Sequence, residues 1–289
     1  LTGAAGTYIS TPDNAALDIT GDIDVRVKVA LDDWTPGSLN TFLGKYNGAG
    51  NQRAYWFYIN TTGNLVFQWS TNGTAPFAAA STAPVTAANG SIKWIRSVLD
   101  VDNGAAGNDV LFYTSDDGEN WVQLGTTVTQ VGVTSIFNSS VGLEIGSRDL
   151  GATDRLTGNV FYAEIRNGIN GTVVANPNFT DWLTTDVSPQ ARTDGAGRTW
   201  TLNGATTIQR TYVSDLDIRV KLSMDDWTPS TTTAIVDKRS MDSAYQLRLE
   251  TSGILTFSMS ANNTVVSFAN TGVSLGFIDG SIHWIRVTQ

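Results

Sequence analysis

A thirteen-residue segment that occurs twice limits the fold of this chain more than any other feature of its sequence. Residues 24–36 read DVRVKVALDDWTP and residues 217–229 read DIRVKLSMDDWTP, with nine positions identical. Two further segments return in the same order, residues 55–70 as 245–260 and residues 90–96 as 280–286. The copies lie roughly 190 residues apart, far beyond the period of solenoid or propeller repeats. We therefore predict two tandem copies of one domain type, a complete one over residues 1–208 and the first half of another over residues 209–289.

The repeated segment has the alternation of a β-strand with one buried face. Val25, Val27, Val29 and Leu31 are separated by Arg26, Lys28 and Ala30, a period of two residues. Only 16% of the residues are charged and 28 are glycine, a composition suited to short strands joined by tight turns. Further strands are predicted over residues 55–59 and 65–69 (a hairpin), 92–101, 109–115, 121–124, 141–145, 158–166 and 200–204. The fold class is thus predicted to be all-β.

Charge and residue types exclude several classes of function. The formal net charge of -9 opposes binding to nucleic acid, which needs clustered lysine and arginine. No apolar run approaches the roughly 18 residues of a membrane-spanning helix, so no membrane insertion is expected. The chain has no cysteine and one histidine, His283, which leaves no thiolate metal site and no histidine-based catalytic triad.

Several segments together resemble the concanavalin A-like, laminin G-like jelly roll. They are the strand that ends in Asp33-Trp34 and residues 90–96, 112–121, 145–147 and 156–166. More narrowly, the chain resembles such domains in minor tail proteins of bacteriophages that infect actinobacteria. The resemblance implies tandem antiparallel jelly-roll sandwiches, the second incomplete, in a virion assembled in the host cytoplasm. Its partners would be other virion proteins, with a homo-oligomer as one option.

Comparison of the two copies separates scaffold positions from candidate binding positions. Trp34 with Trp227, and Trp94 with Trp284, are identical in both copies and are predicted to be buried scaffold. Within one strand, an alternate set is apolar in both copies: Tyr55, Phe57 and Ile59 match Tyr245, Leu247 and Leu249.

The intervening residues of that strand, Trp56 and Tyr58, point to the other face and match the polar Gln246 and Arg248. Aromatic side chains on a sheet face are common platforms for sugar rings. Trp56 and Tyr58 are therefore the predicted carbohydrate-binding residues, with Tyr46 and Arg53 of the adjoining glycine-rich loop as neighbouring contacts. The competing interpretation is that a loop or the second sheet covers them.

Three hypotheses for the function follow. The first is a non-enzymatic adhesion module of a phage tail that binds a host-surface carbohydrate, with no cofactor. The second is a structural or decoration domain that contacts other virion proteins and binds no sugar. The weakest is a glycan hydrolase, because retaining glycosidases of this fold carry paired carboxylates about 5 Å apart, whereas Glu144 and Glu164 stand singly and are predicted to have structural or surface roles.

Two loops carry acidic clusters, for which structural roles are preferred. Residues 114–121 fit the Asp-box pattern, a turn capped by an aspartate. Oxygen ligands for calcium are grouped between residues 100 and 109, namely Asp100, Asp102, Asn103, Asn108 and Asp109. These residues do not have the spacing of an EF-hand loop, and the loop is predicted to bind no metal.

The second copy stops at the position that matches residues 98–100 of the first. We expect such a half-sandwich to leave an open apolar face, formed by Ile218, Val220, Leu222, Leu247, Leu249 and Phe257. The sequence is accordingly expected to be a segment of a longer tandem-domain polypeptide, or to be completed by another chain.

Overall fold

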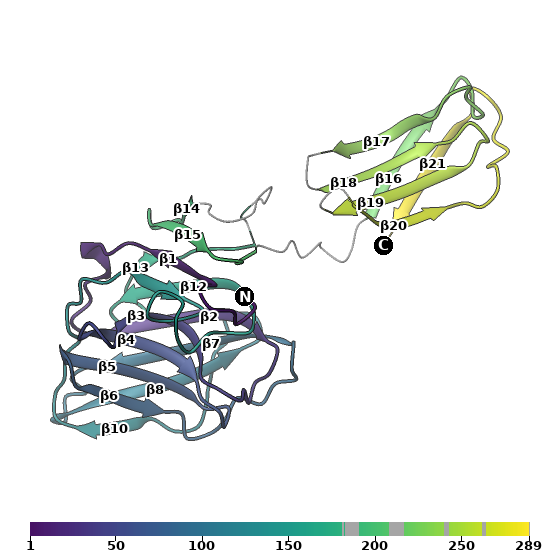
Figure 1. Cartoon of the computed structure of the whole chain (residues 1–289). Helices are drawn as coiled ribbons and strands as arrows, with labels where there is room; N and C mark the ends of the chain where they lie inside the picture. The colour runs from purple at the N-terminus through teal and green to yellow at the C-terminus, as the bar shows by residue number, and fades with distance from the viewer. Residues whose placement is uncertain (181, 183–190, 208–216, 240–242, 262–263, 289) are drawn as a thin grey trace. The chain divides into compact units, whose positions relative to one another are not determined.

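A computed structural model describes residues 1–180, 182, 191–207, 217–239, 243–261 and 264–288, and these form two compact units (Figure 1). Apart from one short 3-10 helix, η1 (Ala15–Leu17), the regular elements of the described residues are β-strands. All strand pairs with an assigned register are antiparallel, which confirms the predicted all-β jelly-roll sandwich class. The predicted boundary between residues 208 and 209 lies outside the described residues and stays a prediction.

The first unit consists of two sheets packed face to face. The eight-stranded sheet has the order β14-β15-β1-β11-β3-β4-β5-β6. Its strands are β1 (Tyr8–Thr11), β3 (Asn40–Asn47), β4 (Gln52–Ile59), β5 (Leu65–Gly73), β6 (Pro76–Ala80), β11 (Leu143–Ile145), β14 (Ala191–Thr193) and β15 (Thr199–Asn203).

The seven-stranded sheet has the order β10-β8-β7-β2-β12-β13, and β9 pairs with β8 beside this path. Its strands are β2 (Ile23–Leu31), β7 (Ile92–Asp100), β8 (Gly107–Ser115), β9 (Val122–Gln123), β10 (Val128–Val131), β12 (Gly158–Asn167) and β13 (Thr172–Ala175). The repeated segment thus forms β2, which lies between β7 and β12 near the middle of its sheet.

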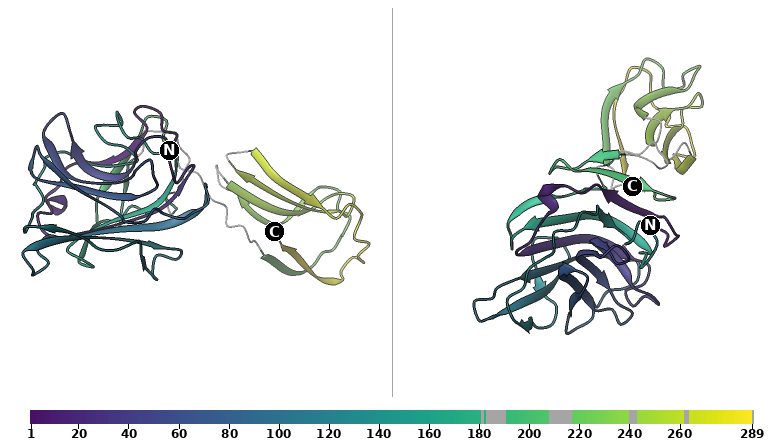
Figure 2. Two further views of the ribbon diagram at one scale, coloured as in Figure 1. Left: turned by 90° about the horizontal axis from the view of Figure 1, so that it is seen from below. Right: turned by 60° about the vertical axis from the view of Figure 1, so that its left-hand side comes forward.

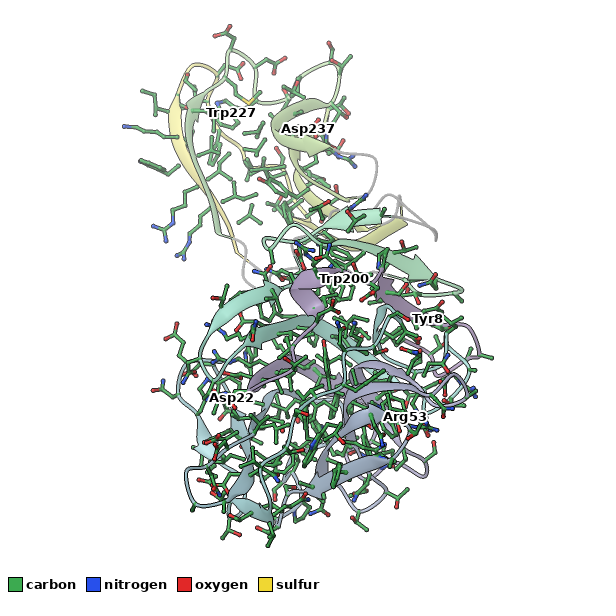
Figure 3. The ribbon with its side chains drawn as sticks, turned by 90° about the vertical axis from the view of Figure 1, so that its left-hand side faces the viewer. Tyr8, Asp22, Arg53, Trp200, Trp227 and Asp237 are labelled. Carbon is green, nitrogen blue, oxygen red and sulfur yellow. The ribbon has the colours of Figure 1, made fainter. Side chains whose placement is uncertain are left out.

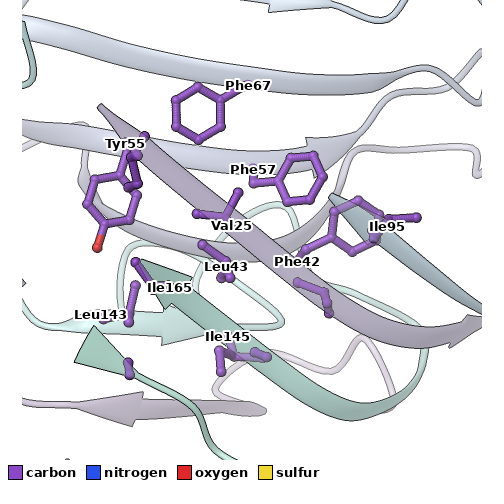
Figure 4. Close-up of a cluster of buried hydrophobic side chains, with 14 of the residues drawn as sticks. Val25, Phe42, Leu43, Tyr55, Phe57, Phe67, Ile95, Leu143, Ile145 and Ile165 are labelled. Atoms are coloured by element: carbon purple, nitrogen blue, oxygen red, sulfur yellow. The ribbon is translucent and has the colours of Figure 1, made fainter. Parts of the chain in front are cut away.

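The core lies between the sheets and follows the predicted alternation. Val25, Val27 and Val29 of β2 are fully buried and meet Tyr55 and Phe57 of β4 in one cluster (Figure 4). Alternate residues of a strand point to opposite faces, so Arg26, Lys28, Trp56 and Tyr58 stand on the outer faces. Side chains that can bind a ligand are therefore to be sought on these two outer faces.

The predicted hairpin between β4 and β5 is confirmed. Ile59 pairs with Leu65, and the side-chain oxygen of Asn60 accepts hydrogen bonds from the backbone N–H groups of Thr62 and Asn64, both at 3.0 Å. Gly63 in this turn has a φ of +79°, and an added Cβ would lie 3.0 Å from the carbonyl oxygen of Trp34. Glycine is required here by backbone conformation and by space.

The second unit contains a two-stranded sheet, β16 (Asp217–Ser223) with β21 (Ile282–Thr288), and a four-stranded sheet. The four strands are β17 (Thr233–Arg239), β18 (Ser243–Leu249), β19 (Leu255–Ala261) and β20 (Thr264–Asn270) (Figure 2). The expectation of an open apolar face is wrong, because the two sheets bury Leu247, Leu249 and Phe257 against Ile218 and Ile285.

The two copies share more than strand order. The backbone N–H of Trp34 donates to Asn89 Oδ1 at 3.0 Å, and that of Trp227 donates to Asp279 Oδ1 at 2.9 Å. Both indole rings are buried, as predicted for scaffold residues, and Figure 3 labels Trp227 in its unit. No helix within the described ranges is long and apolar enough to cross a membrane.

Candidate functional site

The four predicted binding residues come together on the outer face of the eight-stranded sheet. Tyr46 of β3 pairs directly with Arg53 of β4, and Trp56 and Tyr58 follow along β4 (Arg53 is labelled in Figure 3). The rings of Trp56 and Tyr58 are stacked with centroids 3.8 Å apart, and the ring of Tyr46 lies 5.5 Å from that of Trp56. Together with Val66 they form a small apolar cluster, separate from the core.

This cluster is closed rather than open, which corrects the prediction that Trp56 offers an exposed platform. Only 3% of Trp56 and 9% of Tyr58 are accessible to solvent. The guanidinium of Arg148 lies 4.5 Å from the Trp56 ring centroid and 5.4 Å from that of Tyr46, in cation–π geometry. A loop therefore covers the aromatic face, as in the competing interpretation.

Two features of β3 position the Trp56 ring. The indole Nε1–H donates to Thr41 Oγ1 at 3.0 Å, which satisfies its one polar group. A Cβ at Gly44 would lie 3.1 Å from Trp56 Cδ1, so the absence of a side chain at this position makes room for the ring. Trp56 is consequently a packed residue of the outer face, and its contribution to stability is larger than the sequence suggested.

Arg148, which sequence analysis missed, is fixed in the loop between β11 and β12. Its Nε donates to Asp154 Oδ2 at 2.5 Å, and its Nη1 lies 3.4 Å from Asp149 Oδ2. Asp149, Leu150 and Asp154 have φ values of 57°, 58° and 48°. Such positive values are costly for residues other than glycine and often mark ligand-binding segments. The available signal was a long loop with four charged residues in a chain poor in charge.

The loop between β3 and β4 completes the rim of the cluster. The backbone N–H of Gly48 donates to Asp149 Oδ1 at 2.9 Å, which ties this loop to that of Arg148. The Arg53 guanidinium lies 6.0 Å from the Tyr46 ring, so two guanidinium groups flank one tyrosine. Burial, followed by the charge of Asp154 and the neighbouring Tyr46, raises the pKa of Tyr58 to about 12. The Tyr58 hydroxyl therefore stays protonated at neutral pH, where it can donate a hydrogen bond.

The two candidate catalytic carboxylates are engaged in the structure of the sandwich, as predicted. Glu144 accepts hydrogen bonds from the backbone N–H of Leu150 at 2.8 Å and from Ser147 Oγ at 3.1 Å. Burial raises the pKa of Glu144. Glu164, on the other sheet, accepts from the Tyr162 hydroxyl and from Arg166 Nε, both at 2.6 Å. The two groups belong to different sheets and already have partners.

The predicted Asp-box turn is confirmed as a structural cap. Asp117 Oδ1 accepts from the backbone N–H groups of Glu119 and Asn120, both at 2.8 Å. A hydrogen bond from the Asn120 side chain, followed by these two backbone bonds, stabilises the ionised form and lowers the pKa of Asp117. The hydrogen bonds of Asp117 within the turn account for this residue as a structural cap.

The oxygens of the acidic loop between β7 and β8 mainly cap its own turns. Asp102 Oδ1 accepts from Gly104 N at 3.1 Å, and Asn103 Oδ1 accepts from Ala105 N at 2.9 Å. Asp109 Oδ1 accepts from Thr129 Oγ1 at 2.6 Å. Among the described residues, no group of three or more histidine, cysteine, aspartate or glutamate side chains is placed to hold a metal ion. That the loop binds no calcium stays a prediction.

The second tryptophan pair departs from its predicted scaffold role. Trp94 is half-buried on the outer face of the seven-stranded sheet, and 69% of Trp284 is accessible to solvent. In the first unit, Gly118 of the Asp-box turn and Tyr162 of β12 lie against the Trp94 ring. Identity between the copies therefore does not imply burial in the core at this position.

This chain is similar to known proteins in structure, and the comparisons of its sequence found no match. No family model matches the chain, and no curated protein matches it in sequence. Domains LG4-5 of the mouse laminin α1 chain are similar with 12% identity, over 100% of this chain and 72% of that one, at a TM-score of 0.42. The carbohydrate-binding module CBM40 of the Ruminococcus gnavus IT-sialidase, bound to α2,3-sialyllactose, is 11% identical over 58% of this chain and 91% of that one, at 0.42. The NanB sialidase of Streptococcus pneumoniae, as a mutant, is 10% identical over 93% and 39%, at 0.37.

Proposed function

We propose that this chain is a non-enzymatic carbohydrate-binding module that serves adhesion of a phage virion to a host-surface glycan. The single observation that carries the proposal is the aromatic cluster of Tyr46, Trp56 and Tyr58 outside the core, flanked by the guanidinium groups of Arg53 and Arg148. Sugars are recognised by flat apolar groups beside hydrogen-bond donors. The carboxylates Glu144 and Glu164 have structural partners, which supports binding without hydrolysis.

The proposed contacts lie at the rim of the closed cluster. Arg53 and Arg148 are partly exposed, whereas the ring of Trp56 is covered. A sugar would therefore meet the two guanidinium groups and the edge of Tyr58, with Trp56 as the packed support beneath. Arg53 is already oriented by Asn51 Oδ1 and the Gly73 carbonyl, at 2.9 and 3.1 Å. Such preorganisation lowers the entropic cost of binding.

A structural virion domain remains the second candidate, and exposed apolar residues favour it. Val122 of β9, Val131 of β10 and Val133 are 68%, 100% and 58% accessible. Val122 and Val131 belong to the end of the seven-stranded sheet formed by β9 and β10, and Val133 follows β10. Apolar side chains at a sheet edge suit contact with another protein. This candidate predicts binding to virion proteins and to no sugar.

The test is a glycan array probed with the intact chain and with arginine variants. Arg148→Ala and Arg53→Ala remove the rim donors, and each is expected to weaken binding about tenfold or more, since a hydrogen bond to a charged group contributes about 1.5–3 kcal/mol. Arg155→Ala is the matched control, because Arg155 lies in the same loop and donates to the carbonyls of Gly3 and Ala152 rather than flanking the aromatic cluster. The proposal would be contradicted if the intact chain retained no glycan. It would also be contradicted if Arg148→Ala bound the glycan as tightly as the unchanged chain, or more tightly.

A further inference from the structure

The outer face of the seven-stranded sheet carries a second group of aromatic and basic side chains. In one cross-strand row, Lys28 of β2 lies between Trp94 of β7 and Tyr162 of β12. In the next row, Arg26 lies between Arg96 and Glu164. Trp121, which follows the Asp-box turn, packs edge-on against Trp94 with centroids 6.3 Å apart.

Most of the charges on this face are paired with each other. Arg26 and Arg96 each donate to the carboxylate of Asp24 with terminal nitrogens at 2.8 Å. Asp24 itself is fully buried, so this group acts as a clamp between β2 and β7. Arg166 is paired in the same way with Glu164, at 2.6 Å.

Lys28 is the exception. Its ammonium lies 5.8 Å from the centroid of the Trp94 ring and 5.9 Å from that of Phe161, over the faces of both. Within the part of the chain that the structure describes, no carboxylate lies within ion-pair distance of it. A cation without a carboxylate partner, in a chain with a net charge of -9, is placed to receive an anion from outside.

The second unit repeats this arrangement with fewer covering residues. Lys221 of β16 pairs with Trp284 of β21 in the register that joins Lys28 to Trp94. The Lys221 ammonium lies 5.9 Å from the Trp284 ring centroid. Both side chains are exposed, Trp284 to 69%. Most of the Trp284 side chain is thus accessible to a ligand.

The repeat preserves the outer face of these strands more strictly than the core face. Most outward residues are identical in both copies: Arg26, Lys28, Ile92, Trp94 and Arg96 match Arg219, Lys221, Ile282, Trp284 and Arg286, whereas Ala30 matches Ser223. The inward residues Val27 and Ile95 are retained as Val220 and Ile285, but five others have changed: Val25, Val29, Leu31, Lys93 and Ser97 match Ile218, Leu222, Met224, His283 and Val287, three of them by exchange of one apolar residue for another.

Simple retention of an ancestral sequence would keep both faces alike. Packing alone would constrain the core face, because solvent-facing strand positions tolerate substitution with little effect on stability. The Asp24 clamp gives a structural reason for Arg26 and Arg96. It gives none for the lysine–tryptophan pair, which makes no contact with that carboxylate.

We propose that the Lys28–Trp94 pair and the Lys221–Trp284 pair are two corresponding binding sites for an anionic polysaccharide. In both, the ammonium would pair with an acidic substituent of the sugar. In the second unit the exposed Trp284 ring would also stack on an apolar face of a sugar ring, whereas in the first unit Gly118 and Tyr162 already lie against the Trp94 ring, so that the Lys28 ammonium is the main contact. Sites on both units would let one chain bind the same polymer twice, which raises the overall affinity without new contacts. The inference rests on the proposed function only in that the ligand is a glycan.

The test uses the intact chain and pairs of acidic and neutral polymers with the same sugar backbone. Isothermal titration calorimetry gives the dissociation constant and the number of sites per chain, first for oligogalacturonate and its methyl ester and then for dextran sulfate and dextran. We expect two sites per chain for an acidic polymer and at least tenfold weaker binding for its neutral counterpart. Binding of oligogalacturonate assigns carboxylates as the recognised groups, and binding of dextran sulfate alone assigns sulfate esters.

Lysine variants locate the sites. Lys28→Met and Lys221→Met keep the aliphatic stem and remove the charge, so each is expected to abolish one site and the double variant both. Lys93→Met is the matched control, because Lys93 lies on β7 but is paired with Asp116. Trp284→Ala tests the ring without loss of folding, since this side chain is largely exposed. It is expected to weaken the second site about tenfold.

Three results would overturn the inference. They are equal binding of the acidic and neutral polymers, unchanged affinity of the Lys28→Met/Lys221→Met variant, and loss of binding in Lys93→Met equal to that in Lys28→Met. If glycan binding responds to Arg148→Ala but not to either lysine variant, the inference fails while the proposed function stands. If no glycan binds the intact chain, both fail.

Discussion

Replacement of Trp56 by alanine tests whether the outer aromatic cluster is a packed element of the sandwich. Truncation of a buried tryptophan costs about 3–5 kcal/mol. Trp56 is 3% exposed, is stacked on Tyr58 and lies beneath Arg148, so the full range applies. For a unit of this size, 1 kcal/mol lowers Tm by about 2–4 °C, and the expected shift is roughly 6–20 °C.

Thermal unfolding of the intact chain, followed by far-UV circular dichroism, measures this shift. Trp284→Ala is the matched control, because the same side chain is removed from an exposed site and its cost should stay within about 0.5 kcal/mol. Trp56→Phe keeps most of the packing but leaves the buried Thr41 hydroxyl without its donor. It should cost about 1–3 kcal/mol. Equal Tm values for Trp56→Ala and Trp284→Ala would refute the packed cluster.

Three further predictions follow from buried and capped charges. Burial alone would raise the pKa of Asp24, but the hydrogen bonds from Arg26 and Arg96 outweigh it and lower the pKa. The ionised carboxylate therefore contributes to the free energy of unfolding above its unfolded pKa of about 4, and this contribution is lost as the pH falls below that value. Asp24→Asn should remove part of that acid dependence in urea titrations between pH 2 and 6, and an unchanged profile would contradict the clamp. Because the pKa of Tyr58 is raised to about 12, stability is expected to decline as the pH rises from about 10 through this value, and Tyr58→Phe should shift the alkaline unfolding midpoint upward. Chelation with EDTA should leave Tm unchanged, because the oxygens of the loop from Asp100 to Asp109 accept protein hydrogen bonds; a reversible loss of stability would reveal a cation site.

The strands could be predicted because their signals are local. The alternation of Val25, Val27 and Val29 with polar residues determines both the strand and its buried face. Asn60 and Gly63 determine the turn of the hairpin between β4 and β5 through a side-chain cap and a positive φ. The same alternation correctly placed Trp56 and Tyr58 on the face away from the core.

Whether those side chains are exposed could not be predicted, because that depends on residues far apart in sequence. Arg148 covers Trp56 from a loop some 90 positions later, and no local pattern links the two. The same reason explains the error at Trp94 and Trp284. Identity between copies reports a shared constraint, and only the three-dimensional structure tells whether that constraint acts in the core or on the surface.

The half-sandwich expectation failed for a different physical reason. An apolar strand face does not stay open if another sheet of the same unit can cover it. In the second unit, β16 and β21 pack across the four-stranded sheet and bury Leu247 and Leu249. A core can therefore form from fewer strands than the first unit contains.

The most direct test of the account is equilibrium binding of a glycan library to the intact chain, with chemical analysis of the sugar that is recovered. We expect saturable retention of a glycan whose length and composition are unchanged after prolonged incubation. We also expect Arg148→Ala or the Lys28→Met/Lys221→Met variant to weaken this retention. Recovery of shortened sugar chains would show a hydrolase, and the absence of any retained glycan would contradict a carbohydrate-binding function.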